Sequence, residues 1–139
     1  PTPTPTDTPT PTPTSTNAPV CMLTSSGILL SGKNLETNIT NNGDTLATIT
    51  GITVNWPDEP DSQSIGEIKL NGVTIVMADD PLPPSDYPSE KNWTGTQSDL
   101  QFGAFTSKQL ILLFTDDLRP SGYDITLTFD NGCALNEGY

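Results

Sequence analysis

Carboxylates are the main candidate chemical groups of this chain, because the sequence contains no histidine. They gather in three places: Asp58, Glu59 and Asp61; Asp79, Asp80 and Asp86; and Asp116 and Asp117. Loops with several carboxylates at the end of a β-sandwich can bind Ca²⁺ through oxygen ligands. None of the three follows the EF-hand pattern, and solvated acidic loops are the commoner explanation. We therefore expect no cofactor, with Ca²⁺ as the weaker alternative and no other metal.

Enzymatic chemistry has little support in the sequence. Two carboxylates can act as acid and nucleophile in glycoside hydrolysis, but an acidic chain offers such pairs by chance. Without histidine a serine nucleophile lacks its usual base, and G-x-S-x-G, S-x-x-K and glycine-rich phosphate loops are all absent from the sequence. We expect a protein that is not an enzyme.

The charge balance and the distribution of apolar residues exclude two further classes of protein, namely nucleic-acid-binding and membrane-spanning ones. The 139 residues include 17 acidic and 5 basic ones, a net charge of −12. Binding to nucleic acid needs clustered Lys and Arg against the phosphates, which this chain lacks. No run of about 18 apolar residues occurs, so we expect no membrane span.

The two cysteines, Cys21 and Cys133, predict one disulfide. The alternative is a pair of buried free thiols in a cytosolic protein. A bond between them would close a loop of about a hundred residues and contribute roughly 4–5 kcal/mol in the chain-entropy model. It would also tie together the two ends of the domain, so that a pulling force bypasses the core. No C-x-x-C spacing suggests a metal or redox site.

Two aromatic residues and two asparagines are candidates for contact with carbohydrate. Trp93 lies in a polar stretch with Tyr87 nearby, and exposed aromatic rings can stack on sugars. A loop Trp folded back over the edge of the sandwich is the competing interpretation, and Trp56 is expected in the core. Asn38 and Asn92 begin N-glycosylation sequons, of which Asn92 is the better candidate because we expect it in a loop.

The first 19 residues form a segment of alternating Thr and Pro that holds half of the 14 prolines. Such a sequence cannot bury a core and favours extended polyproline II, a stiff spacer. It serves either as a plain linker or as an O-glycosylated stalk, since Thr and Ser with Pro are typical of mucin-like segments. The candidate O-glycosylation acceptors are Thr2, Thr4, Thr6, Thr8, Thr10, Thr12, Thr14, Ser15 and Thr16.

Residues 20–139 are predicted to form one domain of β-strands, because apolar residues alternate with polar ones. Leu35, Thr37 and Ile39 share one face of the first clear strand. Residues 45–56 form the next, where Gly51 is expected to mark a bulge that changes the alternation between Ile49 and Ile52.

The second half of the domain repeats this pattern. Asn71-Gly72 predicts a hairpin turn that pairs Leu70 with Val73 and Ile68 with Ile75. Residues 78–104 are expected to be irregular. Residues 110–114 predict a central strand buried on both faces. The inward residues of the last strand are expected to be Tyr123, Ile125, Leu127 and Phe129.

The chain resembles small Ig-like β-sandwich domains of bacterial surface proteins joined by Thr-Pro linkers. The resemblance rests on the cysteine near the start of the domain, ITGITVNWP (49–57), IKLNG (68–72) and YDITLTFDNGCAL (123–135). It implies an extracellular or cell-surface module without catalytic activity. The predicted fold class is all-β, an Ig-like antiparallel β-sandwich over residues 20–139 preceded by an extended Thr/Pro-rich segment over residues 1–19.

The leading functional hypothesis is a structural subunit or repeat unit of a glycosylated extracellular filament or surface stalk. Its partners would be identical subunits and glycans, with neither nucleic acid nor a membrane span involved. The alternative is a surface adhesin or carbohydrate-binding module on a Thr-Pro stalk.

Overall fold

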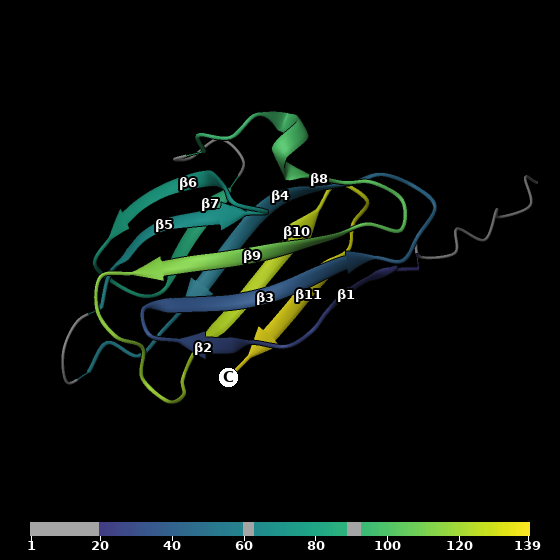
Figure 1. The fold of residues 1–139 in the computed structure, drawn as a ribbon. Coiled ribbons are helices and arrows are strands. Elements are labelled where there is room, and N and C mark those ends of the chain that lie inside the picture. Colours follow the sequence, from purple (N-terminus) through teal and green to yellow (C-terminus); the bar gives the residue numbers. More distant parts are fainter. Residues whose placement is uncertain (1–19, 60–62, 89–92) are drawn as a thin grey trace, which may run out of the picture.

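The computed structural model describes residues 20–59, 63–88 and 93–139, and the described chain is an all-β sandwich of two antiparallel sheets (Figure 1). The first sheet has the order β1-β3-β9-β5-β6, with β2 also paired to β3. Its strands are β1 (Leu23–Ser25), β2 (Leu29–Ser31), β3 (Asn34–Asn41), β5 (Ile65–Leu70), β6 (Val73–Asp80) and β9 (Ser107–Phe114). The second sheet has the order β11-β10-β4-β7, with β8 also paired to β4. Its strands are β4 (Ala47–Asn55), β7 (Ser85–Pro88), β8 (Gln101–Phe102), β10 (Asp124–Phe129) and β11 (Ala134–Gly138).

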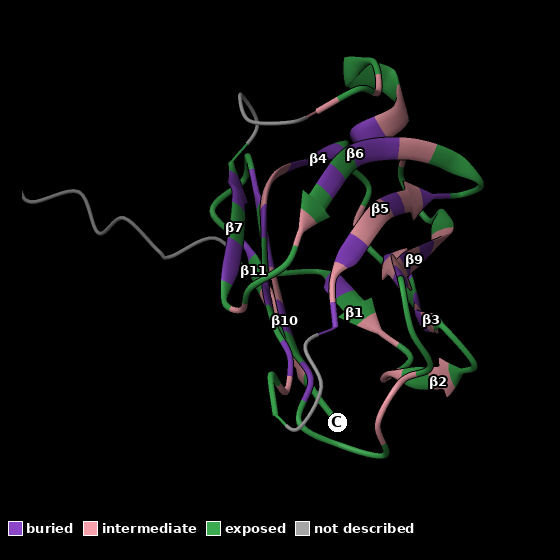
Figure 2. Cartoon of the chain, turned by 90° about the vertical axis from the view of Figure 1, so that its left-hand side faces the viewer, coloured by how far each residue is buried: buried purple, intermediate pink, exposed green. Residues whose placement is uncertain are grey.

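The core lies between the two sheets, where the apolar half of each alternation meets the other (Figure 2). On β3 the inward residues are Leu35, Thr37 and Ile39, as the sequence predicts. On the other sheet Tyr123, which precedes β10, and the inward residues of that strand are also buried. The period-two pattern therefore identified the inner face of both strands correctly.

The predicted bulge at Gly51 is present in β4. Thr128 of β10 pairs with Gly51, whereas Phe129 pairs with Ile49, so one residue of β4 is unmatched. The bulge brings both Ile49 and Ile52 into the core. A Cβ atom at Gly51 would lie 2.8 Å from the Thr128 hydroxyl oxygen, which explains glycine here.

The Asn71-Gly72 turn joins β5 to β6, but part of its predicted register is wrong. Both turn residues have positive φ, as a two-residue hairpin of this kind requires. Leu70 pairs with Val73 as expected, while Ile68 pairs with Val76 and not with Ile75. An extra residue on β6 shifts the alternation, so that Ile75 and Val76 are both buried.

Strand β9 is central in its sheet, as predicted, but only one of its faces is fully buried. Leu110, Leu112 and Phe114 point into the core. Ile111 and Leu113 are half-buried on the outer face, where no second layer covers them among the described residues. A strand of consecutive apolar residues is therefore buried on one face in a two-layer sandwich, whereas the same strand is buried on both faces where a layer covers each side of its sheet.

The region 78–104 is more regular than expected. Strand β6 continues to Asp80, and the region also holds β7, β8 and the short 3₁₀ helix η1 (Gln97–Leu100). Two short edge strands therefore stand where the sequence showed mainly Asp, Pro, Ser and Gly. This segment also supplies four of the residues that line the pocket described below, namely Trp93, Gly95, Gln97 and Leu100.

One buried hydroxyl of the described core makes no hydrogen bond, and it predicts a stabilising substitution. Thr37 is 4% exposed, and its Oγ1 has no partner. We expect Thr37→Val to raise the free energy of unfolding by about 1 kcal/mol, because an unpaired buried polar group is removed. Urea unfolding measures this, with Thr40→Val as the control on the same strand, since the Thr40 hydroxyl bonds that of Ser107 at 2.7 Å. A lower stability for Thr37→Val would show that the hydroxyl has a solvent partner.

Candidate functional site

The predicted disulfide between Cys21 and Cys133 is present. Their Cα atoms are 5.3 Å apart, and the bond closes a separation of 112 residues. Cys21 precedes β1 and is exposed, whereas Cys133 is buried in the turn between β10 and β11. That turn is fixed locally, since the Asn131 side chain accepts a hydrogen bond from the Cys133 backbone N–H at 3.0 Å. The bond therefore joins the start of the described domain to the last hairpin.

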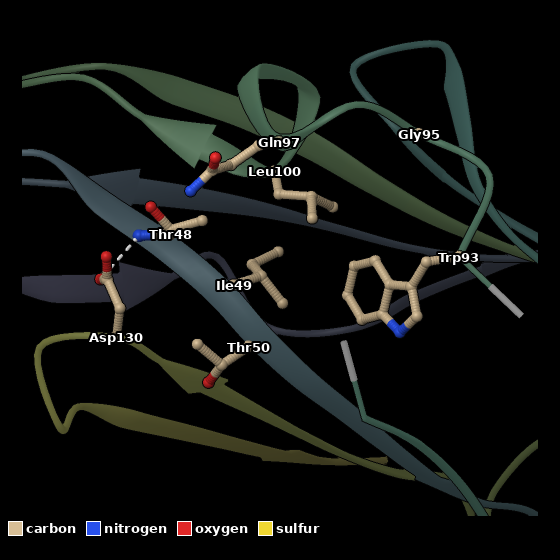
Figure 3. Close-up of a pocket in the computed structure, with 8 residues that line it drawn as sticks. All are labelled: Thr48, Ile49, Thr50, Trp93, Gly95, Gln97, Leu100 and Asp130. Carbon is tan, nitrogen blue, oxygen red and sulfur yellow. Dashed lines mark hydrogen bonds between the residues drawn. The ribbon is translucent and has the colours of Figure 1, made fainter. Parts of the chain in front are cut away.

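A pocket of about 350 Å³ lies beside the edge of β4, next to a stretch that no described strand pairs on this side. On this edge, Ala47 and Thr48 pair with β8, and residues 51–54 pair with β7. Neither of these strands pairs with Ile49 or Thr50. The pocket occupies this interval (Figure 3). Its lining residues are Thr48, Ile49, Thr50, Trp93, Gly95, Gln97, Leu100 and Asp130.

Trp93 forms one end of the pocket and is anchored to both sheets. Its backbone bridges Val76 of β6, and the next residue donates a backbone hydrogen bond to Ile75 at 2.9 Å. Its indole N–H donates to the carbonyl oxygen of Pro88 at the end of β7. The ring is half-buried and packs against the core. The competing interpretation, a Trp folded over the sandwich edge, is therefore correct, yet part of the ring remains at the surface beside the pocket.

Close packing at Gly95 and the hydrogen bonds of Asp99 position the segment after Trp93. A Cβ atom at Gly95 would lie 3.1 Å from a methyl group of Ile75, so this residue lets the chain run close over β6. Asp99 accepts hydrogen bonds of 2.7 Å from both the hydroxyl and the backbone N–H of Thr96. These bonds, first that of the hydroxyl, lower the pKa of the Asp99 carboxyl. The wall formed by η1 is thereby positioned before any ligand arrives.

Asp130 stands at the opposite end of the pocket from Trp93, with Ile49 between them (Figure 3). Its Oδ1 accepts a hydrogen bond from the Thr48 backbone N–H at 2.9 Å, and its own N–H donates to the Thr48 carbonyl at 3.0 Å. No hydrogen bond within the described chain uses Oδ2 of Asp130 or the side-chain amide of Gln97. Both residues are exposed. The pocket therefore offers a fixed carboxylate oxygen and an amide at its rim.

Sequence reasoning missed Asp130 and Gln97. The turn signal Asp130-Asn131-Gly132 marks a loop, but it does not reveal that this loop lies across β4 from Trp93. Such proximity depends on the strand order of the second sheet, which the local pattern does not encode.

Tyr87 is not available to a ligand, contrary to its pairing with Trp93 in the sequence prediction. It is fully buried in β7, because it lies on the inward face of that strand opposite Ile52. Its hydroxyl donates a hydrogen bond to Asp80 at 3.3 Å. Burial raises the pKa of Tyr87 to about 12, and the negative charge of Asp80 adds to this.

The raised pKa of Tyr87 predicts a loss of stability in alkali. The folded protein binds the phenolic proton more tightly than the unfolded chain, whose tyrosine pKa is near 10. This contribution is fully present below about pH 10 and is lost as the pH rises toward about 12. Urea unfolding at about pH 9 and about pH 11 should therefore show a steeper decline for the natural protein than for Tyr87→Phe. Equal declines would contradict the assignment.

The other predicted carbohydrate and modification sites are only partly within the described chain. Asn38 is exposed on the outer face of β3, in the middle of the strand and not in a loop. Asn92, and the Thr and Ser acceptors of residues 1–19, lie outside the described residues. Of the two asparagines that begin sequons, Asn38 is therefore the one that lies within the described residues.

In the described part of the chain, no group of three metal-binding side chains is found. Asp80 accepts hydrogen bonds from Ser85 and Tyr87, and Asp86 accepts one from Thr53 at 3.0 Å. Asp61 lies outside the described residues. Asp80 and Asp86 of the second cluster thus have partners within the protein.

Comparison with known proteins leaves the fold and the pocket as the main guides to function. No helix in residues 20–59, 63–88 and 93–139 is long and apolar enough to cross a membrane. No protein-family model matches the chain, and no curated protein matches it either.

Proposed function

We propose that this chain is a structural unit of an extracellular filament or cell-surface stalk, with the β-sandwich as its folded body and residues 1–19 as its spacer. The observation that carries the proposal is the Cys21–Cys133 disulfide, which sits where the spacer enters the domain. A disulfide persists in oxidising surroundings, which favours a location outside the cytosol.

The position of the disulfide suits a unit under tension. A force applied at residue 20 passes through Cys21 to Cys133 and from there along β11 to residue 139. The strands between the two cysteines lie outside this path. Since β11 is already extended, the load meets a short and nearly straight segment.

The Thr-Pro spacer and the charge support the same proposal. The alternating Thr and Pro of residues 1–19 are the composition expected of a stiff spacer with acceptors for O-linked sugars. Sixteen of the 17 acidic residues belong to residues 20–139. A strongly negative domain stays soluble when many copies are crowded on a surface.

Electron microscopy and mass spectrometry of native material test this proposal. We expect regular filaments or stalks, and hexose masses on the peptide of residues 1–19. A native protein that stays monomeric at high concentration, with residues 1–19 unmodified, would overturn it.

A second candidate function is a surface adhesin or carbohydrate-binding module carried on the Thr-Pro spacer. The observation that favours it is the half-exposed ring of Trp93 beside an open pocket. Screening of the full chain against immobilised glycans tests it, and saturable binding to a glycan is the expected result. Absence of binding to every glycan would reject this candidate and leave the stalk proposal intact.

A further inference from the structure

We infer that the pocket between Trp93 and Asp130 binds a neutral saccharide, with the indole as a platform and the carboxylate and amide as partners for its hydroxyls. This inference rests on the carbohydrate-binding candidate and is independent of the stalk proposal. At about 350 Å³, the pocket falls within the range of about 300–1,000 Å³ that is usual for small-molecule sites.

The lining side chains divide into an apolar part and a polar rim. Trp93 supplies an aromatic surface, and Ile49 and Leu100 form the floor. Asp130 and Gln97 supply polar groups at its rim. A pyranose ring has the matching composition, since its C–H groups can cover an indole while its hydroxyls point outward.

Oδ2 of Asp130 and the side-chain amide of Gln97, both at the rim, make no hydrogen bond within the described chain, and both favour a ligand that carries hydroxyl groups. Oδ2 of Asp130 is a pure acceptor, so it requires a donor such as a hydroxyl. The Gln97 amide both donates and accepts, which suits a hydroxyl because a hydroxyl does the same. A purely apolar ligand would cover these atoms without giving them partners, which costs free energy.

Charge and shape disfavour the other ligand classes. Among the described residues, those that line the pocket include no Lys or Arg, and Asp130 repels phosphate, sulfate and uronate groups. A single carboxylate does not make a cation site, in keeping with the lack of a three-residue group in the described chain. The stretch of β4 that no described strand pairs on this side spans only residues 49 and 50, which is too short for a peptide to pair as an added strand.

The site is held in shape by the protein itself. Trp93 is fixed through Pro88 and Val76, and Asp130 through two hydrogen bonds to Thr48. Binding a ligand therefore requires little ordering of these side chains, which favours affinity.

Binding of neutral oligosaccharides to variants of the full chain tests the inference. The probes are gluco-, manno-, galacto- and N-acetylglucosamine oligosaccharides, with oligogalacturonate as the anionic comparison. Trp93→Ala should weaken binding by about tenfold or more, since the one aromatic contact among the described lining residues is lost. Asp130→Asn should weaken it several-fold, because the uncharged amide forms weaker hydrogen bonds but can still accept from Thr48. Phe105→Ala is the matched control, since Phe105 is an aromatic residue, 73% exposed, that does not line the pocket.

The outcomes separate the site from the broader function. Neutral saccharides bound by the natural protein and Phe105→Ala, but weakly by both pocket variants, would support the inference. Saccharide binding that survives Trp93→Ala and Asp130→Asn would overturn this site while leaving a carbohydrate-binding function. Preference for oligogalacturonate would overturn the neutral specificity, and no binding to any probe would reject the saccharide site.

Discussion

The oxidised protein, held by its first and last residues and stretched, is expected to gain no more than about 2 nm of contour length from its domain. After reduction of the disulfide, the same domain should release about 40 nm. The difference arises because Cys21 and Cys133 are covalently joined, so the residues between them cannot be drawn out. Only the six residues after Cys133 remain free to extend, and five of them already form the extended strand β11.

Single-molecule force spectroscopy, with and without a reductant, measures both lengths. Residues 1–19 contribute equally in the two states and therefore cancel in the comparison. The Cys21→Ala, Cys133→Ala double variant should behave like the reduced protein under either condition. A long extension of the oxidised natural protein would contradict the load path and remove the main support for the stalk proposal.

The same bond predicts a large effect on equilibrium stability. Closing a separation of 112 residues restricts the unfolded chain, so reduction should lower the free energy of unfolding by about 4–5 kcal/mol. Urea unfolding of oxidised and reduced protein measures this loss.

Gln63→Ala is expected to lower the free energy of unfolding by about 2–4 kcal/mol, a large effect for a polar residue. Gln63 is 3% exposed and lies beside the aromatic cluster of Trp56, Phe114 and Tyr123. Its Oε1 accepts a hydrogen bond from the Tyr123 hydroxyl at 2.8 Å, and its Nε2 donates to the Asp117 carbonyl at 2.6 Å. The substitution removes both bonds and opens a cavity, and it deprives the buried Tyr123 hydroxyl of its acceptor, although that hydroxyl still accepts the Arg119 backbone N–H at 2.8 Å.

A double-mutant cycle isolates the bond to Tyr123. Tyr123→Phe alone should cost about 1–2 kcal/mol, and the two substitutions together should cost clearly less than their sum. The indole N–H of Trp56 bonds the backbone carbonyl of Gln63, so this contact remains in every variant. Strictly additive losses, or a Gln63→Ala variant as stable as the natural protein, would contradict the role of this buried amide.

The fold could be predicted from the sequence where local alternation decides it. Tyr123, Ile125, Leu127 and Phe129 alternate with polar residues, and all four are buried. Gly51 marked its bulge because a change of alternation and a glycine coincide there. The predicted pairing of Ile68 with Ile75 is wrong because Ile75 is the extra residue of a bulge in β6, and no glycine marks this bulge in the sequence.

The candidate site could be predicted only in part. Trp93 was identified from its polar neighbours, whereas Tyr87 was wrongly placed at the surface. Tyr87 belongs to β7 and faces inward opposite Ile52, whereas Trp93 forms a single bridge to Val76 at the edge of β6. Strand β7 has only four residues, so its alternation cannot be recognised in the sequence. Asp130 and Trp93 are separated by 37 positions in the sequence and are brought together only by their common neighbour β4.

The four sheet edges have a consequence for aggregation. The β1–β2 edge is interrupted after Ser25, where Gly27 has a φ of +81°. On the β7–β8 edge, no described residue of either strand pairs with residues 49 and 50 of β4. The β6 edge is covered in its middle by the backbone of Trp93. Short, broken or covered edges are poor templates for a further strand. Within the described chain β11 is the edge without such an interruption, and Glu137 places a charge on it. Intermolecular strand pairing is therefore directed to the β11 edge, which in the stalk proposal is also the strand under load.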